Sequence, residues 1–135
     1  MLVPPSSFQI STVWPFLTKG VKRSHLLTYS EQLATKIELL CENIKAPSNT
    51  LFQIRKSSSS IYANIREANY GQSKADMLSK FEIALKECSE TEGWLRLLFN
   101  TNAIDEEIYK KHRNLCGRIR RMLIASCKTL KESIK

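Results

Sequence analysis

Residues 73–100, SKADMLSKFEIALKECSETEGWLRLLFN, carry the pattern that decides the fold. The side chains expected to face inward recur at alternating steps of four and three residues, at Met77, Phe81, Ala84, Cys88, Thr91, Leu95 and Leu98. That spacing predicts a long amphipathic helix with one continuous apolar face. Ser73, three residues before Asp76, is a typical cap for its start.

The same helical period continues on both sides of this stretch. It predicts helices at about 28–45, 49–69, 73–100 and 103–134. The expected caps are Thr28 with Glu31, Ser48 or Asn49, and Asn102 with Asp105. The last helix is expected to face inward with Ile104, Ile108, Leu115, Ile119 and Met122. Short connections favour antiparallel neighbours, so the predicted fold is all-α, an antiparallel up-down-up-down four-helix bundle over residues 28–135.

Residues 1–27 differ in composition from the rest of the chain. They hold three of the four prolines and no acidic residue, so we predict an irregular N-terminal arm. Its apolar side chains are too many for a solvated tail. We therefore expect the arm to dock on the bundle or on a neighbouring subunit.

Composition gives a first indication of partners and compartment. The 135 residues carry a formal net charge of +8, which favours polyanionic partners. The four cysteines form no CxxC pair, and neither a secretory leader nor an apolar run long enough to span a membrane is visible. We expect a cytoplasmic protein with reduced thiols and no membrane association.

Two short motifs carry a family resemblance. SIYANIREAN at 60–69 contains the pattern A-N-I-x-E at Ala63, Asn64, Ile65 and Glu67. The stretch 72–98 contains A-L-x-E, followed by further acids and Trp94. In both, the chain resembles the 23S ribosomal RNA intervening-sequence proteins and is more distantly similar to the accessory variability determinants of diversity-generating retroelements.

The resemblance implies a four-helix bundle, a homopentamer and no established enzymatic activity. We interpret Asn64 and Glu67 as structural residues that hydrogen-bond across helices or at the turn and fix the helix register.

The positive charge is concentrated in the last predicted helix. At 100° per residue, seven of its nine basic side chains fall within an arc of about 120°, opposite the expected apolar face. They are Lys110, Arg113, Arg120, Arg121, Lys128, Lys131 and Lys135. This basic face predicts contact with the phosphate backbone of RNA or DNA. It has no aromatic platforms, so sequence-specific binding is not expected.

Two helices carry a second apolar stripe, which a single bundle does not need. One consists of Ile83, Glu87, Glu90, Trp94 and Leu97, and the other of His112, Cys116, Leu123 and Leu130. We predict that both form a homo-oligomer interface. Two alternatives remain open: the arm covers one stripe within the same chain, or the chain is a protein-interaction scaffold with no nucleic-acid role.

Enzymatic and metal chemistry find no supporting motif. There is no E-x-x-H pair, no phosphate-binding loop and no dinucleotide motif. His112 and Cys116 lie one turn apart, and Cys127 lies farther along roughly the same side of the helix. A metal site would also need Cys41 or Cys88, and both occupy apolar-face positions. The sequence therefore predicts no catalytic residue, no metal, no cofactor and no small-molecule substrate.

Overall fold

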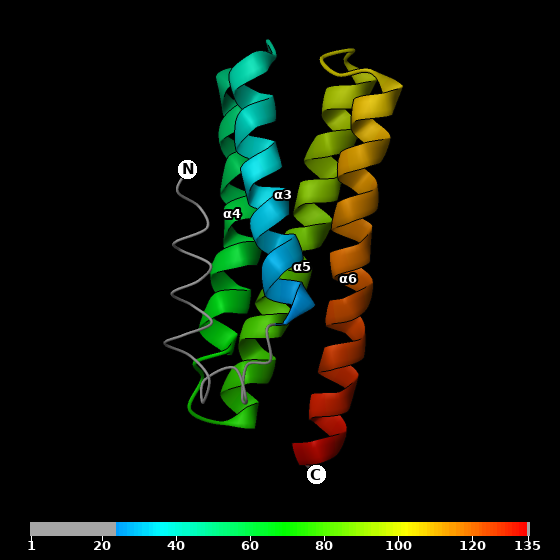
Figure 1. Ribbon diagram of the computed structural model, residues 1–135. Coiled ribbons are helices and arrows are strands. Elements are labelled where there is room, and N and C mark those ends of the chain that lie inside the picture. The colour runs from blue at the N-terminus through cyan, green and yellow to red at the C-terminus, as the bar shows by residue number, and fades with distance from the viewer. Residues whose placement is uncertain (1–23, 135) are drawn as a thin grey trace, which may run out of the picture.

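The computed structural model describes residues 24–134, which form four helices. They are α3 (His25–Asn43), α4 (Ser48–Ala68), α5 (Lys74–Asn100) and α6 (Glu106–Ile134). Successive helices run in opposite directions, and each packs against its neighbours in a ring of α3, α4, α5 and α6 (Figure 1). The predicted all-α four-helix bundle is confirmed. No described helix combines the length and the apolarity that a membrane crossing requires.

The core follows the predicted periods in α4 and α5. In α5 the buried positions are Phe81, Ala84, Cys88, Thr91, Leu95 and Leu98, with Met77 half-buried at the end of the row. In α4 the buried isoleucines Ile54, Ile61 and Ile65 face them. Each fully buried side chain of this size contributes about 1.5–3 kcal/mol, so these rows hold the bundle together.

The first helix begins earlier than the sequence pattern suggested. Ser24 is its N-cap, and the Ser24 hydroxyl accepts a hydrogen bond from the Leu27 amide at 3.1 Å. Thr28 lies inside the helix and does not cap it. The shift extends the helix by one turn, which buries Leu26 against the bundle. The helix thus includes residues 25–27 of the predicted arm, and the docking predicted for the rest of that arm lies outside the described residues.

The other predicted caps agree in part. Ser73 caps α5 as expected, with its hydroxyl accepting from the Asp76 amide at 3.1 Å. Ser48 is instead the first residue of α4, which Pro47 precedes without a side-chain cap.

Asn102 ends α5 and does not begin α6. It takes the left-handed conformation, with φ 64°, which asparagine tolerates better than most residues. The amides of Asn102 and Ala103 then donate to the carbonyls of Phe99 (3.0 Å) and Leu98 (2.9 Å), a Schellman ending. Asp105 caps α6, because its carboxylate accepts from the Ile108 amide at 2.8 Å.

The buried face of α6 is rotated from the predicted one. The buried positions are Tyr109, Cys116, Gly117, Ile119, Leu123 and Cys127, whereas Ile108, Leu115 and Met122 are only half-buried. Cys116 and Leu123 are both fully buried inside this one chain, so their assignment to an oligomer interface is wrong. The small thiol of Cys116 fits against α5, where it donates to the Cys88 carbonyl at 3.5 Å.

Candidate nucleic-acid interface

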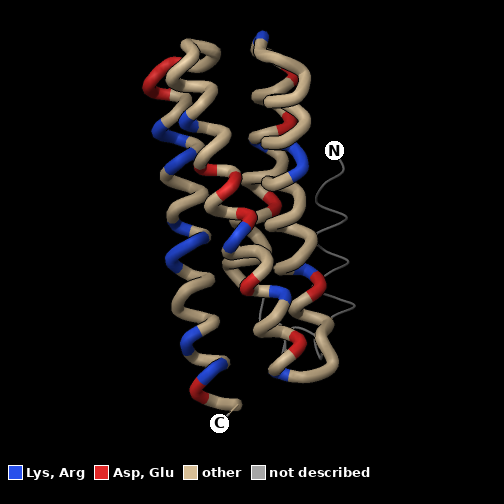
Figure 2. Tube along the Cα trace, turned by 180° about the vertical axis from the view of Figure 1, so that it is seen from behind, with Lys and Arg blue, Asp and Glu red and all other residues tan. Residues whose placement is uncertain are grey.

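Lysines and arginines recur down the length of α6 (Figure 2). Of the predicted basic face, Lys110, Arg113, Arg121, Lys128 and Lys131 are exposed, Arg120 is half-buried, and Lys135 lies outside the described residues. The face borders α5, since Arg120 and Lys131 reach acids of that helix. The prediction that the basic face lies directly opposite the core was therefore wrong, because the buried face of α6 is rotated from the predicted one.

Three members of the basic face have acidic partners. Arg120 Nε lies 3.2 Å from Glu92 Oε2, and Lys131 Nζ lies 3.5 Å from Glu82 Oε2. Lys110 Nζ pairs with Glu106 Oε2 of its own helix at 2.9 Å. Such solvent-exposed pairs are each worth about 1 kcal/mol or less, so they do not hold these cations away from a polyanion.

The remaining described members have no ion pair within residues 24–134. Arg121 and Lys128 have no acid within 4.0 Å in that range. The Arg113 guanidinium lies 5.3 Å from the centre of the Tyr109 ring and donates to Asn114 Oδ1 at 3.1 Å. Uncompensated positive charge therefore lies along the outer side of α6.

A groove between α5 and α6 brings several of these groups together. It has a volume of about 440 Å³ and is lined by Arg113, Arg120 and Arg121 of α6 and by Arg96 and Glu92 of α5. Arg96 was missed in the sequence, because residues 73–100 carry a slight net negative charge and no basic pattern of their own. The only indication in the sequence was that Arg96 follows Glu92 by one helical turn, which places the two side chains on the same side of the helix.

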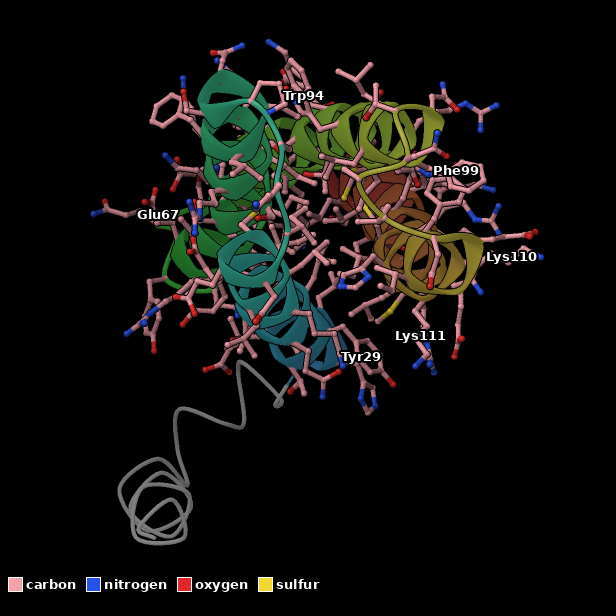
Figure 3. The ribbon with its side chains drawn as sticks, turned by 90° about the horizontal axis from the view of Figure 1, so that it is seen from above. Tyr29, Glu67, Trp94, Phe99, Lys110 and Lys111 are labelled. Atoms are coloured by element: carbon pink, nitrogen blue, oxygen red, sulfur yellow. The ribbon has the colours of Figure 1, made fainter. Side chains whose placement is uncertain are left out.

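Arg96 is held in place by an aromatic pair. Its Nη1 donates to the Tyr109 hydroxyl at 3.1 Å. The Tyr109 ring stacks on Phe99, with centroids 4.7 Å apart and planes 9° apart. Phe99 and Lys110 lie on the α5–α6 side of the bundle in Figure 3.

The α5 stripe lies on the opposite flank of that helix, beside α4. Ile83 and Leu97 are 40% and 41% exposed, Glu90 is exposed, and Trp94 and Glu87 are half-buried. In Figure 3, Trp94 lies at the outer boundary of α4 and α5. Burial raises the pKa of the Glu87 carboxyl, and the nearby Glu90 carboxylate raises it further. Residues 24–134 thus leave this stripe partly exposed to solvent.

On α6, the two remaining members of the second predicted stripe are His112 and Leu130. Both are half-buried beside Cys116 and Leu123. His112 Nδ1 lies 2.7 Å from the Ile108 carbonyl oxygen of its own helix. Residues 24–134 contain no group of three or more His, Cys, Asp or Glu arranged to hold a metal ion.

The family-motif residues have structural contacts. Ile65 is fully buried, and Ala63 is exposed. Asn64 Nδ2 donates to the Ser60 carbonyl at 2.8 Å within its own helix, so the predicted bond across helices or at the turn is wrong for Asn64. Glu67 does reach the next helix, where Lys80 Nζ lies 3.2 Å from its Oε1.

Comparison with known proteins places the chain in a family. A solved structure with a TM-score of 0.74 is 40% identical and covers 76% of this chain and 98% of its own. It is described as a protein of unknown function from the S23 ribosomal protein family of Bacteroides thetaiotaomicron VPI-5482. A search of curated proteins gave no match. The family model for the 23S rRNA-intervening sequence protein matches residues 22–125, and the chain belongs to that family.

Proposed function

We propose that this chain is a non-enzymatic, homo-oligomeric protein that binds nucleic acid through the basic face of α6. The observation that carries the proposal is the row of exposed cations along one helix, of which Arg113, Arg121 and Lys128 have no ion pair in the described part of the chain. Phosphate groups are the expected ligands, because lysine and arginine contacts to the backbone dominate sequence-independent binding.

The α5 stripe supports self-association. Ile83, Trp94 and Leu97 place apolar surface on a helix that already buries another face in its own bundle. A second copy covering this stripe would remove that surface from water and would set several α6 faces side by side. The pentamer is the state that the family resemblance suggests. The four free cysteines fit a reducing compartment, so we place the protein in the cytoplasm.

A salt titration tests nucleic-acid binding. With about five single-strand phosphate contacts, each with a slope of about −0.7, affinity for a short RNA falls about a hundredfold between about 50 and 200 mM salt. The double variant Arg121→Glu, Lys128→Glu should lose binding at both salt concentrations. The matched control is Lys45→Glu, Lys74→Glu, which changes the net charge equally at exposed positions outside α6.

The control separates local from overall charge. If the control loses RNA binding as fully as the α6 variant does, net charge and not this face is responsible. If the unaltered protein binds neither RNA nor DNA at low salt, the chain is better explained as a protein-interaction scaffold. The α5 stripe would then be the surface that binds the partner.

A further inference from the structure

The groove between α5 and α6 holds more positive charge than contacts with the nucleic-acid backbone require. Four guanidinium groups line it, from Arg96, Arg113, Arg120 and Arg121, and Glu92 is the only carboxylate among its lining residues. Like charges gathered along one groove repel one another, and a bound anion would relieve this repulsion. The groove therefore has the electrostatics of an anion site.

Two glycines in helix interiors also line this groove. Gly93 of α5 and Gly117 of α6 both lower helix stability relative to alanine. A Cβ at position 117 would lie 3.4 Å from Arg121 Nη1 and 3.6 Å from Arg120 Nη2. These are ordinary van der Waals distances, so a methyl group at position 117 would occupy groove space beside both guanidinium groups. The two glycines keep the groove open.

Three of the four arginines have orienting contacts, since Arg113 donates to Asn114 Oδ1 at 3.1 Å. Arg96 donates to the Tyr109 hydroxyl at 3.1 Å, and Arg120 is held by Glu92 at 3.2 Å. Arg113 and Arg121 have no ion pair in residues 24–134. Guanidinium groups present paired N–H donors that match the oxygens of a phosphate.

The charge balance favours one kind of phosphate. Glu92 offsets one of the four cations, which leaves about three. An internal phosphodiester carries one negative charge and two free oxygens, whereas a phosphomonoester carries about −1.5 to −2 at neutral pH with three acceptor oxygens. We propose that this groove binds the terminal phosphate of a nucleic-acid strand, an inference that rests on the proposed function.

The test compares one short single-stranded RNA in three forms: 5′-phosphorylated, 3′-phosphorylated, and with hydroxyls at both ends. Fluorescence anisotropy with the full chain should show about tenfold tighter binding of at least one phosphorylated form, the gain expected from added charge-assisted hydrogen bonds. The two phosphorylated arms identify which strand end is bound.

Variants separate the groove from the rest of the face. The double change Arg96→Ala, Arg121→Ala should give all three RNAs one common affinity. Lys128→Ala lies outside the groove lining and should weaken all three by the same factor, so the end preference remains. Gly93→Ala introduces a methyl group that meets no atom within 4 Å, so the bundle still folds while the groove narrows and the end preference falls.

The outcomes distinguish the two proposals. Equal binding of the three RNAs by the unaltered protein overturns the terminal-phosphate site and leaves backbone binding intact. An end preference that survives both the arginine and the Gly93 variants also overturns it. Absence of binding to every RNA, and to DNA strands of the same sequence, at low salt overturns the proposed function itself.

Discussion

At the scale of single residues, two buried hydroxyl groups join α4 to α5. Ser57 Oγ and Thr91 Oγ1 lie 2.8 Å apart, and both residues are at most 1% exposed. Each hydroxyl also has a carbonyl of its own helix within reach, Glu87 at 2.9 Å from Thr91 Oγ1 and Ile54 at 3.3 Å from Ser57 Oγ. One hydroxyl therefore donates to the other, and the second donates within its own helix. Small side chains at Ser57 and Ser58, both buried, allow α4 and α5 to approach closely.

A double-mutant cycle can measure the coupling between the Ser57 and Thr91 hydroxyl groups. Thr91→Val and Ser57→Ala each remove one partner of a buried hydrogen bond, and each should lower the free energy of unfolding by about 1 kcal/mol. The double variant should lose less than the sum of the two, because neither hydroxyl is then left without the other. Urea denaturation measures all three. Ser59→Ala, at an exposed position, is the control, and strictly additive losses would contradict the coupling.

Buried thiols give the stability a pH dependence. The hydrogen bond with Cys88 and burial raise the pKa of Cys116, and burial also raises the pKa of Cys41 and Cys127. In the unfolded chain these thiols ionise near their ordinary pKa of 9.0, whereas in the folded chain the pKa of each is higher. The stabilisation is therefore fully present below about pH 9 and is lost as the pH rises, by about 1.4 kcal/mol per pH unit for Cys116.

Urea denaturation between pH 8 and pH 10 tests this dependence. Lysines and tyrosines titrate in the same range, so the informative comparison is with Cys116→Ala. The variant should be less stable at pH 8, because it leaves a cavity in the core. By pH 10 the difference should shrink by about 1 kcal/mol, since the variant has no thiol to ionise at that position. A constant difference across the range would contradict the assignment.

At the scale of helices, the sequence predicted the buried row of α5 well and the buried face of α6 poorly. The α5 row from Phe81 to Leu98 consists of apolar and small residues at strict heptad spacing. In α6 the buried face includes Tyr109, two cysteines and Gly117, which apolar patterning ranks below Ile108, Leu115 and Met122. The two cysteines and Gly117 are buried because their small size allows α6 to lie close to α5.

Helix boundaries show the same limit. Thr28 and Asn102 both satisfy a capping pattern, but Ser24 and Asp105 cap the helices. In each case the sequence was compatible with two capping residues, about one helical turn apart, at which the helix could begin. The burial of Leu26 and the left-handed ending at Asn102 decided between them, and both depend on the neighbouring helices.

Glycine substitutions test the helix interiors. Gly93→Ala should raise the free energy of unfolding by up to about 1 kcal/mol, because alanine is the better helix former and its Cβ meets nothing within 4 Å. Gly71→Ala should destabilise the turn before α5, since its Cβ would lie 2.9 Å from Asp76 Oδ2 and 3.2 Å from the Ala68 carbonyl oxygen. Thermal or urea denaturation of both variants decides the matter. A stabilising effect at both positions would mean that helix propensity alone governs them.

Substitution of Gly93 affects both the stability of the bundle and the binding of a phosphate in the groove. If the groove binds a terminal phosphate, Gly93→Ala gives a more stable protein with a weaker end preference. Stability and binding would then change in opposite directions at one position, which is expected where a glycine is present for a ligand and not for the fold.

At the scale of the whole molecule, the basic face could be predicted from α6 alone, but the groove could not. Four arginines meet there only because α5 and α6 run side by side, and one of them, Arg96, belongs to a helix with a slight excess of acids. Periodicity places residues around one helix axis and carries no information on how two helices are turned toward each other. The same limit explains why Arg120 and Lys131 were not expected to meet acids of α5.

Assembly through the α5 stripe can be tested by placing charges on it. Trp94→Asp combined with Leu97→Asp places two carboxylates on the surface proposed to meet a second copy, where burying an unpaired charge is strongly unfavourable. Light scattering coupled to gel filtration should show the unaltered chain as an oligomer and this variant as a monomer. The matched control is Leu39→Asp with Phe52→Asp, two exposed apolar residues of α3 and α4, which should leave the oligomer intact. If the control dissociates and the α5 variant does not, the interface lies on α3 and α4. Circular dichroism verifies that each variant keeps its helices, so a fall in mass reports the lost interface and not a lost fold.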